Sequence, residues 1–404
     1  MALNIGAQLG RRTMVFRPGM TIRMGMFVAL LVAIVSLSAG PSARALAVGV
    51  PDRLSDQEFW KLTVDLSEPD AEFISDNLVS NEMSFAQVVP QLRAAVEPGG
   101  VYLGVGPEQN FTYLSAMQAH MGFIIDIRRG NLQLQLMYKA LFELSASRAE
   151  FVSRLFTRAR PAQVTERSSA TELMNAFADV PAGSQSTYRQ NVQELHGVLA
   201  KHGFKLSDDD LSGIDQAYRA FYQYGPSIGY ATTLRKQADS FVTYASLMKQ
   251  LDASGQGLSF LATETAFQFV KDLQSRNLVV PVVGNFAGPK AFRAIGQYLR
   301  KRDAAVAAFY VSNVEDYLGR EQVPANGNWR DFCANVATLP LNERSVFIRP
   351  LGLAVFAADG SLMMSKSMQL LSPNEAVTYP AGSHPPLPSA LFPIAKEVTG
   401  CGGG

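Results

Sequence analysis

Cysteine and histidine are scarce in this sequence of 404 residues. The two cysteines, Cys333 and Cys401, form no C-x-x-C pair and no cluster with histidine, so we expect no metal site. The acidic run Asp208–Asp210 after Ser207 fits a helix N-cap and first turn better than a calcium loop. We expect Cys333 to be buried and Cys401 free, with a disulfide between them, formed outside the cytoplasm, as the alternative.

Motifs of nucleophilic catalysis are also absent. The four histidines do not neighbour a motif serine or cysteine, and no G-x-S-x-G elbow is present. The sequence contains no internal repeat, and no catalytic residue can be predicted from its motifs.

Acidic residues are missing from positions 1–47, which contain five arginines. A run without charge, Met26–Ser42, follows the basic start, and small residues recur at 43–47. This order of basic, apolar and small segments is typical of a signal peptide. We therefore predict residues 1–47 as a signal peptide and the mature protein as periplasmic or secreted. An uncleaved membrane anchor is the alternative, although the apolar core Met26–Ala39 is shorter than the ~20 residues that cross a bilayer.

A strong charge of either sign is lacking as well. Without its first 47 residues the chain loses five arginines and no acid, so its formal net charge changes from +1 to −4. A mildly acidic protein offers no electrostatic basis for nucleic-acid binding. No membrane association is expected after cleavage of the signal. The content of 47% hydrophobic and 18% charged residues indicates a globular chain with a sizeable core and argues against disorder. The partner considered is a small-molecule ligand, which the strand-end pattern described below suggests.

Apolar runs alternate with helical patterns along the remaining chain. The runs at 101–103, 123–125, 278–283, 305–311 and 345–348 lack the period-two polarity of a half-exposed strand. Such runs favour strands that are buried on both faces of a mostly parallel sheet. The expected fold class is therefore α/β, with a Rossmann-like sheet flanked by helices.

The domain organisation follows from the same alternation. We predict a single Rossmann-like domain over 48–404, with two helices before its first strand, starting near Ser55 and Ser84. The helical periodicity within 156–275 indicates a large helical insertion between the second and third strands. Residues 380–404, which begin with a proline-rich stretch, are expected to form an extended C-terminal tail.

The stretch from residue 101 to Asp126 has the pattern of a nucleotide-binding unit. The first apolar run ends in Gly104-Val105-Gly106, and Asp126 follows the second run, 22 positions after Gly104. In a Rossmann-like unit the glycines admit a ligand, and the acidic residue hydrogen-bonds the ribose hydroxyls. Glu108 in the first helical turn would repel a phosphate. A ligand with ribose and adenine but no phosphate, such as S-adenosylmethionine, therefore fits better than a dinucleotide. Arg128 and Arg129 leave a minority case for a 2′-phosphorylated dinucleotide.

Ligands of open parallel sheets bind beyond the carboxyl ends of the strands. Turns after strands often contain Gly, Asn and Asp for backbone reasons alone, so the hypothesis depends on the set rather than on any single residue. The expected ligand-binding residues lie at or just after strand ends: Gly104, Gly106, Glu108, Asn110, Asp126, Arg128, Asn285 and Asn313.

Three stretches, Gly104–Tyr113, Asp126–Asn131 and Val311–Glu315, resemble an uncharacterised bacterial family whose Rossmann-like fold is similar to that of S-adenosylmethionine-dependent methyltransferases. The resemblance implies methyl transfer if the protein is an enzyme. The chain departs from the general methyltransferase pattern, because Tyr102 replaces the acidic residue before the glycines and no Asn-Pro-Pro-Tyr motif is present. Two hypotheses follow: an exported methyltransferase-like protein that binds S-adenosylmethionine or a related adenosyl ligand, or a non-catalytic extracytoplasmic binding or interaction protein.

Overall fold

The computed structural model describes most of the chain after the predicted signal peptide. All the described residues belong to one unit, Ala43–Gly404. The predicted signal peptide, the predicted helix start at Ser84 and Cys401 lie outside the described residues. The described residues are 49–73, 75–83, 85–230, 242–252, 254–318 and 329–350, together with three short strands within 354–393.

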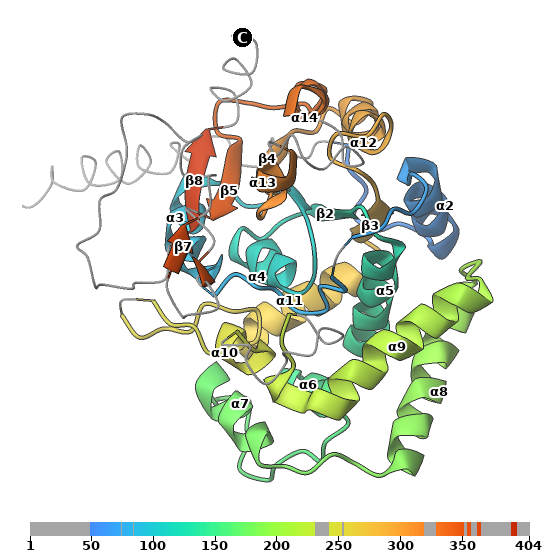
Figure 1. Ribbon diagram of the computed structural model, residues 1–404, viewed down its shortest axis with the longest axis vertical. Coiled ribbons are helices and arrows are strands. Elements are labelled where there is room, and N and C mark those ends of the chain that lie inside the picture. Colours follow the sequence, from blue (N-terminus) through green and yellow to red (C-terminus); the bar gives the residue numbers. More distant parts are fainter. Residues whose placement is uncertain are drawn as a thin grey trace, which may run out of the picture. The chain divides into compact units, whose positions relative to one another are not determined.

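A six-stranded sheet lies at the centre of this unit (Figure 1). Its strand order is β3-β2-β1-β4-β5-β8. The first five strands of this order are parallel, and β8 is antiparallel to β5. The parallel part has the 3-2-1-4-5 order of a Rossmann fold, which confirms the predicted fold class. The strands are β1 (Val101–Gly104), β2 (Met121–Asp126), β3 (Val279–Val283), β4 (Val306–Tyr310), β5 (Val346–Pro350) and β8 (Ser389–Pro393).

The central strands are buried on both faces, as their continuous apolar sequences predict. Every residue of β1, β2, β3 and β4 is buried. The parallel register sets Gly104 beside Ile124 and Asp126 beside Val283. The carboxyl ends of these strands consequently meet at one edge of the sheet.

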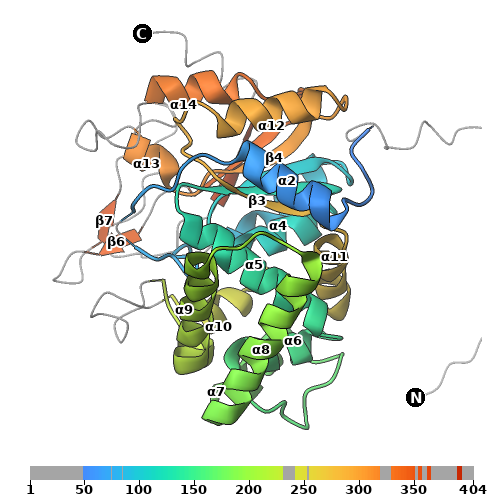
Figure 2. The same cartoon turned by 90° about the vertical axis from the view of Figure 1, so that its right-hand side faces the viewer.

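Helices cover both faces of the sheet, with α12 and α14 on one side and α5 and α11 on the other (Figure 2). The predicted helix start at Ser55 is confirmed: Ser55 and Glu58 form a capping box at the start of α2. The helices outside the segment between β2 and β3 are α2 (Asp56–Leu66), the 3₁₀ turn η1 (Phe85–Val88), α3 (Val89–Ala95), α4 (Gln109–Ala116), α12 (Ala291–Arg300), α13 (Val314–Leu318) and α14 (Trp329–Val336).

The chain between β2 and β3 is helical wherever its elements are described. Ser207 caps α9 as predicted, and the side chain of Asp210 completes its capping box and pairs with Arg129 at 2.6 Å. In the described part of the chain, no helix is long and apolar enough to cross a membrane. The helices of this segment are α5 (Arg129–Leu144), α6 (Arg148–Phe156), α7 (Ala170–Ala178), α8 (Gln185–His202), α9 (Asp208–Tyr224), the 3₁₀ turn η2 (Gly225–Ser227), α10 (Tyr244–Met248) and α11 (Glu264–Ser275).

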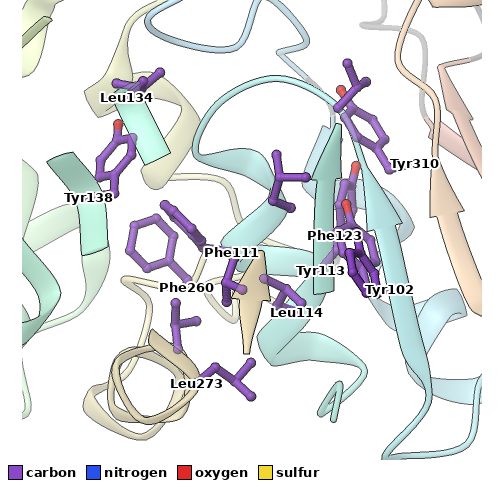
Figure 3. Close-up of a cluster of buried hydrophobic side chains, with 14 of the residues drawn as sticks. Tyr102, Phe111, Tyr113, Leu114, Phe123, Leu134, Tyr138, Phe260, Leu273 and Tyr310 are labelled. Atoms are coloured by element: carbon purple, nitrogen blue, oxygen red, sulfur yellow. The ribbon is translucent and has the colours of Figure 1, made fainter. Parts of the chain in front are cut away.

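One hydrophobic core joins the sheet to this helical segment. Phe111 of α4 contacts Tyr138 of α5 and Phe260, which precedes α11, with ring centroids 5.2 and 5.4 Å apart. Figure 3 shows Phe111 and Phe260 next to each other in this cluster. Burial of aromatic rings contributes strongly to stability. The helical segment is therefore part of the same core as the strands.

Two features of the C-terminal half differ from the predictions. Ser389–Pro393, within the predicted extended tail, forms the edge strand β8. The strands β6 (Ala354–Phe356) and β7 (Leu362–Met364) pair with each other in a separate two-stranded sheet. Cys333 is buried as expected, but the expectation that the cysteines are unpaired is wrong, because Cys333 is disulfide-bonded. The disulfide agrees with the alternative that the sequence left open.

Candidate ligand-binding site

A pocket opens at the carboxyl ends of β1, β2, β3 and β4. Five of the eight predicted residues line it: Gly106, Asp126, Arg128, Asn285 and Asn313. The other three, Gly104, Glu108 and Asn110, are not among the lining residues. The sheet therefore brings most of the predicted set together, while three members face other surroundings.

Aromatic and aliphatic side chains make up much of the remaining wall. A ligand bound among them is removed from water and held by apolar contacts, as is usual for small-molecule sites. Most of these residues could not be predicted from the sequence, because they come from segments without a recognisable motif. They include Phe73, Val79, Ile127, Tyr230, Phe286, Val314, Tyr317 and Leu318.

The glycine turn between β1 and α4 is held from inside the protein. Asn110 is fully buried, and its Nδ2 donates hydrogen bonds to the carbonyl oxygens of Val105, Gly106 and Pro107 at 2.8–3.1 Å. Its Oδ1 accepts a hydrogen bond from the hydroxyl of Tyr102 at 2.7 Å. Asn110 therefore fixes the shape of the turn, and the expectation that it contacts a ligand does not agree with this position.

The two glycines of the turn have different roles. A Cβ at Gly104 would come within 2.0 Å of Asn110 Oδ1 and 2.5 Å of the Tyr102 hydroxyl, so Gly104 makes room for this internal hydrogen bond. Gly106 has φ of +80°, a conformation that favours glycine, and it lines the pocket. Only Gly106 occupies the place that the nucleotide-binding pattern predicts.

Glu108 points into the core, not toward the pocket. Its side chain is fully buried at the start of α4, where Oε1 accepts a hydrogen bond from the backbone N–H of Ser80 at 3.3 Å. Oε2 has no hydrogen-bond partner among the described residues. Burial raises the pKa of Glu108 to about 7. The expectation of a carboxylate that repels phosphate at the pocket is therefore wrong in its geometry, because this carboxyl group is turned away.

Asp126 lines the pocket as predicted, but it is already paired. Arg128 donates from Nε to Oδ1 at 3.0 Å and from Nη2 to Oδ2 at 2.9 Å, and its backbone N–H also donates to Oδ1. Nη1 of Arg128 donates to the carbonyl oxygens of Ser75 and Asp76. Arg128 therefore connects the end of β2 to the segment that contains Phe73, which also lines the pocket.

Asn285 and Asn313 follow β3 and β4 and reach the same pocket. The backbone N–H of Asn285 donates to Glu68 Oε2 at 3.1 Å, and its Oδ1 accepts a hydrogen bond from the N–H of Ala287 at 2.9 Å. Asn313 lies beside Ser312, whose hydroxyl is 3.3 Å from Asn313 Oδ1. Both amides keep hydrogen-bonding capacity for a ligand.

Ser312 and Glu82 were not predicted as functional residues. Ser312 lines the pocket directly after β4, and its hydroxyl donates to Glu82 Oε1 at 2.5 Å. The position of Ser312 after a strand was a signal that sequence reasoning could have used. Glu82 offered no such signal, because 230 positions separate it from Ser312.

The charge of the pocket is nearly balanced. Asp126 and Arg128 are the charged side chains among its described lining residues, and they neutralise each other at 2.9 Å. No group of residues in the described ranges is arranged to hold a metal ion. A neutral or zwitterionic organic molecule matches this lining better than a phosphate ester, which would need unpaired cationic donors.

Comparisons with known proteins place the chain in a family. No curated protein matches it. Among solved structures, the rRNA methyltransferase aviRa from Streptomyces viridochromogenes is similar at a TM-score of 0.24 and 12% identity, over 69% of this chain and 82% of that one. A family model described as a domain of unknown function matches residues 77–369, which include the whole parallel sheet and the pocket's strand ends. The chain therefore belongs to the family Domain of unknown function (DUF7790).

Proposed function

We propose that this protein binds S-adenosylmethionine or a related adenosyl compound in the pocket at the strand ends. The observation that carries the proposal is the meeting of Gly106, with its positive φ, and the carboxylate of Asp126 in one pocket of a Rossmann-ordered sheet. Such a glycine turn lets a ligand approach the backbone closely, and an acidic residue after the second strand is suited to ribose hydroxyls.

The residues fit an adenosyl ligand in three respects. Oδ2 of Asp126 accepts one hydrogen bond from Arg128, and a carboxylate oxygen can accept a second from a ribose hydroxyl. The rings of Phe73, Tyr230 and Tyr317 supply apolar surface for a base. The balanced charge of Asp126 and Arg128 suits a ligand without phosphate. When bound, S-adenosylmethionine would supply an electrophilic methyl group, so methyl transfer is the proposed reaction if the protein is an enzyme.

We also propose that the protein is exported, through the N-terminal signal described above. The disulfide at Cys333 supports this location, because structural disulfides persist mainly in oxidising compartments. An exported protein meets little of a cytosolic cofactor. Together with the Arg128 pairing of Asp126, this supports the second candidate function, a non-catalytic extracytoplasmic binding protein on the same scaffold.

Calorimetric titration of the full-length protein separates the candidates. We expect micromolar binding of S-adenosylmethionine and S-adenosylhomocysteine and much weaker binding of a phosphorylated dinucleotide. Asp126→Asn should weaken adenosyl binding about tenfold, the equivalent of one good hydrogen bond of ~1.4 kcal/mol. The matched control is Asp179→Asn, because Asp179 is exposed at the end of α7 and lies outside the pocket. If the folded wild-type protein binds none of these compounds, the adenosyl proposal is wrong and the non-catalytic binding function is favoured.

A further inference from the structure

Ser312 has an unusual backbone conformation for its residue type. Its φ is +49°, in the left-handed region that costs residues with a Cβ roughly 1–2 kcal/mol. Apart from glycine, Asn and Asp tolerate this region best. In the described part of the chain, three residues that are neither Gly, Asn nor Asp adopt it: Gln118, Thr157 and Ser312. Of these three, only Ser312 lines the pocket. Strain of this kind is concentrated at functional sites, which makes the serine a candidate for a role in chemistry.

The hydroxyl of Ser312 is held by a buried carboxyl group. Its Oγ lies 2.5 Å from Glu82 Oε1, to which it donates. Glu82 is 5% exposed, and its own backbone N–H donates to the hydroxyl of Ser80 at 3.2 Å. A serine whose proton is directed at a carboxylate has the arrangement of a nucleophile with its proton acceptor.

Two described residues, Tyr310 and Asn313, lie next to this pair. The hydroxyl of Tyr310 is fully buried, and burial together with the nearby charge of Glu82 raises the pKa of Tyr310 well above its usual value. Tyr310 therefore stays protonated and does not compete with Glu82 as a base. The side-chain oxygen Oδ1 of Asn313 lies 3.3 Å from Ser312 Oγ and is a second, longer acceptor for the same hydroxyl.

We propose that Ser312 is a catalytic nucleophile, that Glu82 is its proton acceptor, and that the substrate is a carboxylic ester with an apolar acyl group. The apolar part of the ester would lie against Val79, Val314 and Leu318 of the pocket wall. This reaction uses the β4 end of the pocket. It does not depend on adenosyl binding, which is proposed for the β2 end.

The proposed reaction has two steps that balance. In the first, Ser312 Oγ forms a bond to the ester carbonyl carbon while its proton passes to Glu82. The bond to the alcohol oxygen then breaks, and the alcohol leaves with the proton from Glu82. In the second step, a water oxygen bonds to the acyl carbon and gives a proton to Glu82. The acyl–Oγ bond breaks, the carboxylic acid leaves, and the proton returns to Ser312.

A fluorophosphonate probe tests this assignment on the full-length protein. Attack by Ser312 Oγ forms an oxygen–phosphorus bond, releases fluoride and leaves a stable adduct. We expect intact-mass analysis to show one adduct per chain and peptide mapping to place it on Ser312. Absence of an adduct on the folded wild-type protein, or an adduct on a different residue, would overturn the proposal.

Three variants make the test specific. Ser312→Ala should abolish labelling, and Glu82→Gln should slow it by about 10², the lower end of general-base contributions. Ser115→Ala is the matched control and should label normally, because the Ser115 hydroxyl donates to the carbonyl oxygen of Thr112 and lies outside the pocket. Equal labelling rates in wild type and Glu82→Gln would refute the role of Glu82.

If Glu82→Gln does not fold, hydrolysis of a p-nitrophenyl ester decides instead. Turnover should be lost in Ser312→Ala and kept in Ser115→Ala, and equal turnover in both variants would refute the proposal. Titration of Ser312→Ala with S-adenosylmethionine separates this proposal from the adenosyl function, since the variant keeps Asp126 and Gly106.

Discussion

The buried carboxyl group of Glu108 should make the stability of this protein fall as pH rises from about 4.5 to 8. Burial raises the pKa of Glu108 from 4.5 to about 7. Between these two values the folded protein keeps a proton that the unfolded chain has lost, so unfolding is favoured progressively as pH increases. The neighbours Tyr138 and Tyr244 do not titrate in this range, because burial raises the pKa of each well above 10.

The size of the effect follows from the shift. A difference of one pKa unit corresponds to about 1.4 kcal/mol, so a shift from 4.5 to about 7 costs the folded state about 3 kcal/mol once the pH is well above 7. Below pH 4.5 the cost disappears. Glu108→Gln keeps the shape of the side chain and has no charge at any pH, so it should remove this component of the pH dependence.

Urea unfolding of wild type and Glu108→Gln at pH 5, 6, 7 and 8 measures the difference directly. Contributions from the other titratable groups occur in both proteins and cancel in the difference. We expect the unfolding free energy of Glu108→Gln, relative to that of the wild type, to increase by about 2.5 kcal/mol between pH 5 and pH 8, because part of the shift has already occurred at pH 5. A difference in unfolding free energy that stays constant across this range would show that Glu108 is ionised or solvated in the folded protein, and would refute the reasoning.

Three further predictions concern other buried polar groups. Asn110→Ala removes the amide group whose two N–H donors are shared among three carbonyl oxygens of the glycine turn, and it leaves these buried acceptors unpaired. The unfolding free energy should fall by about 3 kcal/mol in urea unfolding, whereas a loss below ~1 kcal/mol would show that the turn keeps its shape without Asn110. Asp126→Ala leaves the buried Arg128 without its carboxylate and should cost about 3 kcal/mol by the same assay, and an unchanged midpoint would contradict this. His202 bonds Glu143 at 2.9 Å and Asp56 at 2.7 Å, and these bonds, that to Glu143 foremost, raise its pKa. The stabilisation of the folded protein by protonated His202 is complete below the ordinary pKa of 6.5 and is lost as pH rises through the raised pKa. His202→Gln should therefore lower the unfolding free energy more at pH 5.5 than at pH 9, and equal losses at the two pH values would refute the ion pair.

The sheet could be predicted because each of its central strands has a local sequence signal. The runs at 101–103, 123–125 and 278–283 are continuously apolar, and each ends near a turn residue, which is enough to infer buried parallel strands. The edge strand β8 could not be found in this way. Its pairing with β5 joins segments about 40 positions apart, and its proline-flanked sequence resembles a surface segment.

The pocket was only partly predictable, for a reason that concerns side-chain direction. Strand ends locate the backbone of Gly106, Asp126, Asn285 and Asn313, and the parallel sheet brings them together. At the start of a helix, however, successive side chains point in different directions. Gln109 reaches the pocket, while Asn110, one position later, is directed at the carbonyl groups of its own turn.

Polar residues near the strand ends therefore have two different roles in this fold, and their hydrogen-bond partners distinguish the two roles. A buried turn requires donors for its inward carbonyl groups, and Asn110 meets that need completely. A ligand requires polar groups that still have capacity, which Asn313 and Oδ2 of Asp126 retain at the pocket surface. Ser312 differs from both, because its hydroxyl is bonded to a carboxyl group while its backbone has a φ of +49°, in the left-handed region. Replacement by glycine would relieve that strain by roughly 1–2 kcal/mol, but it would also remove the hydroxyl on which the proposed reaction depends.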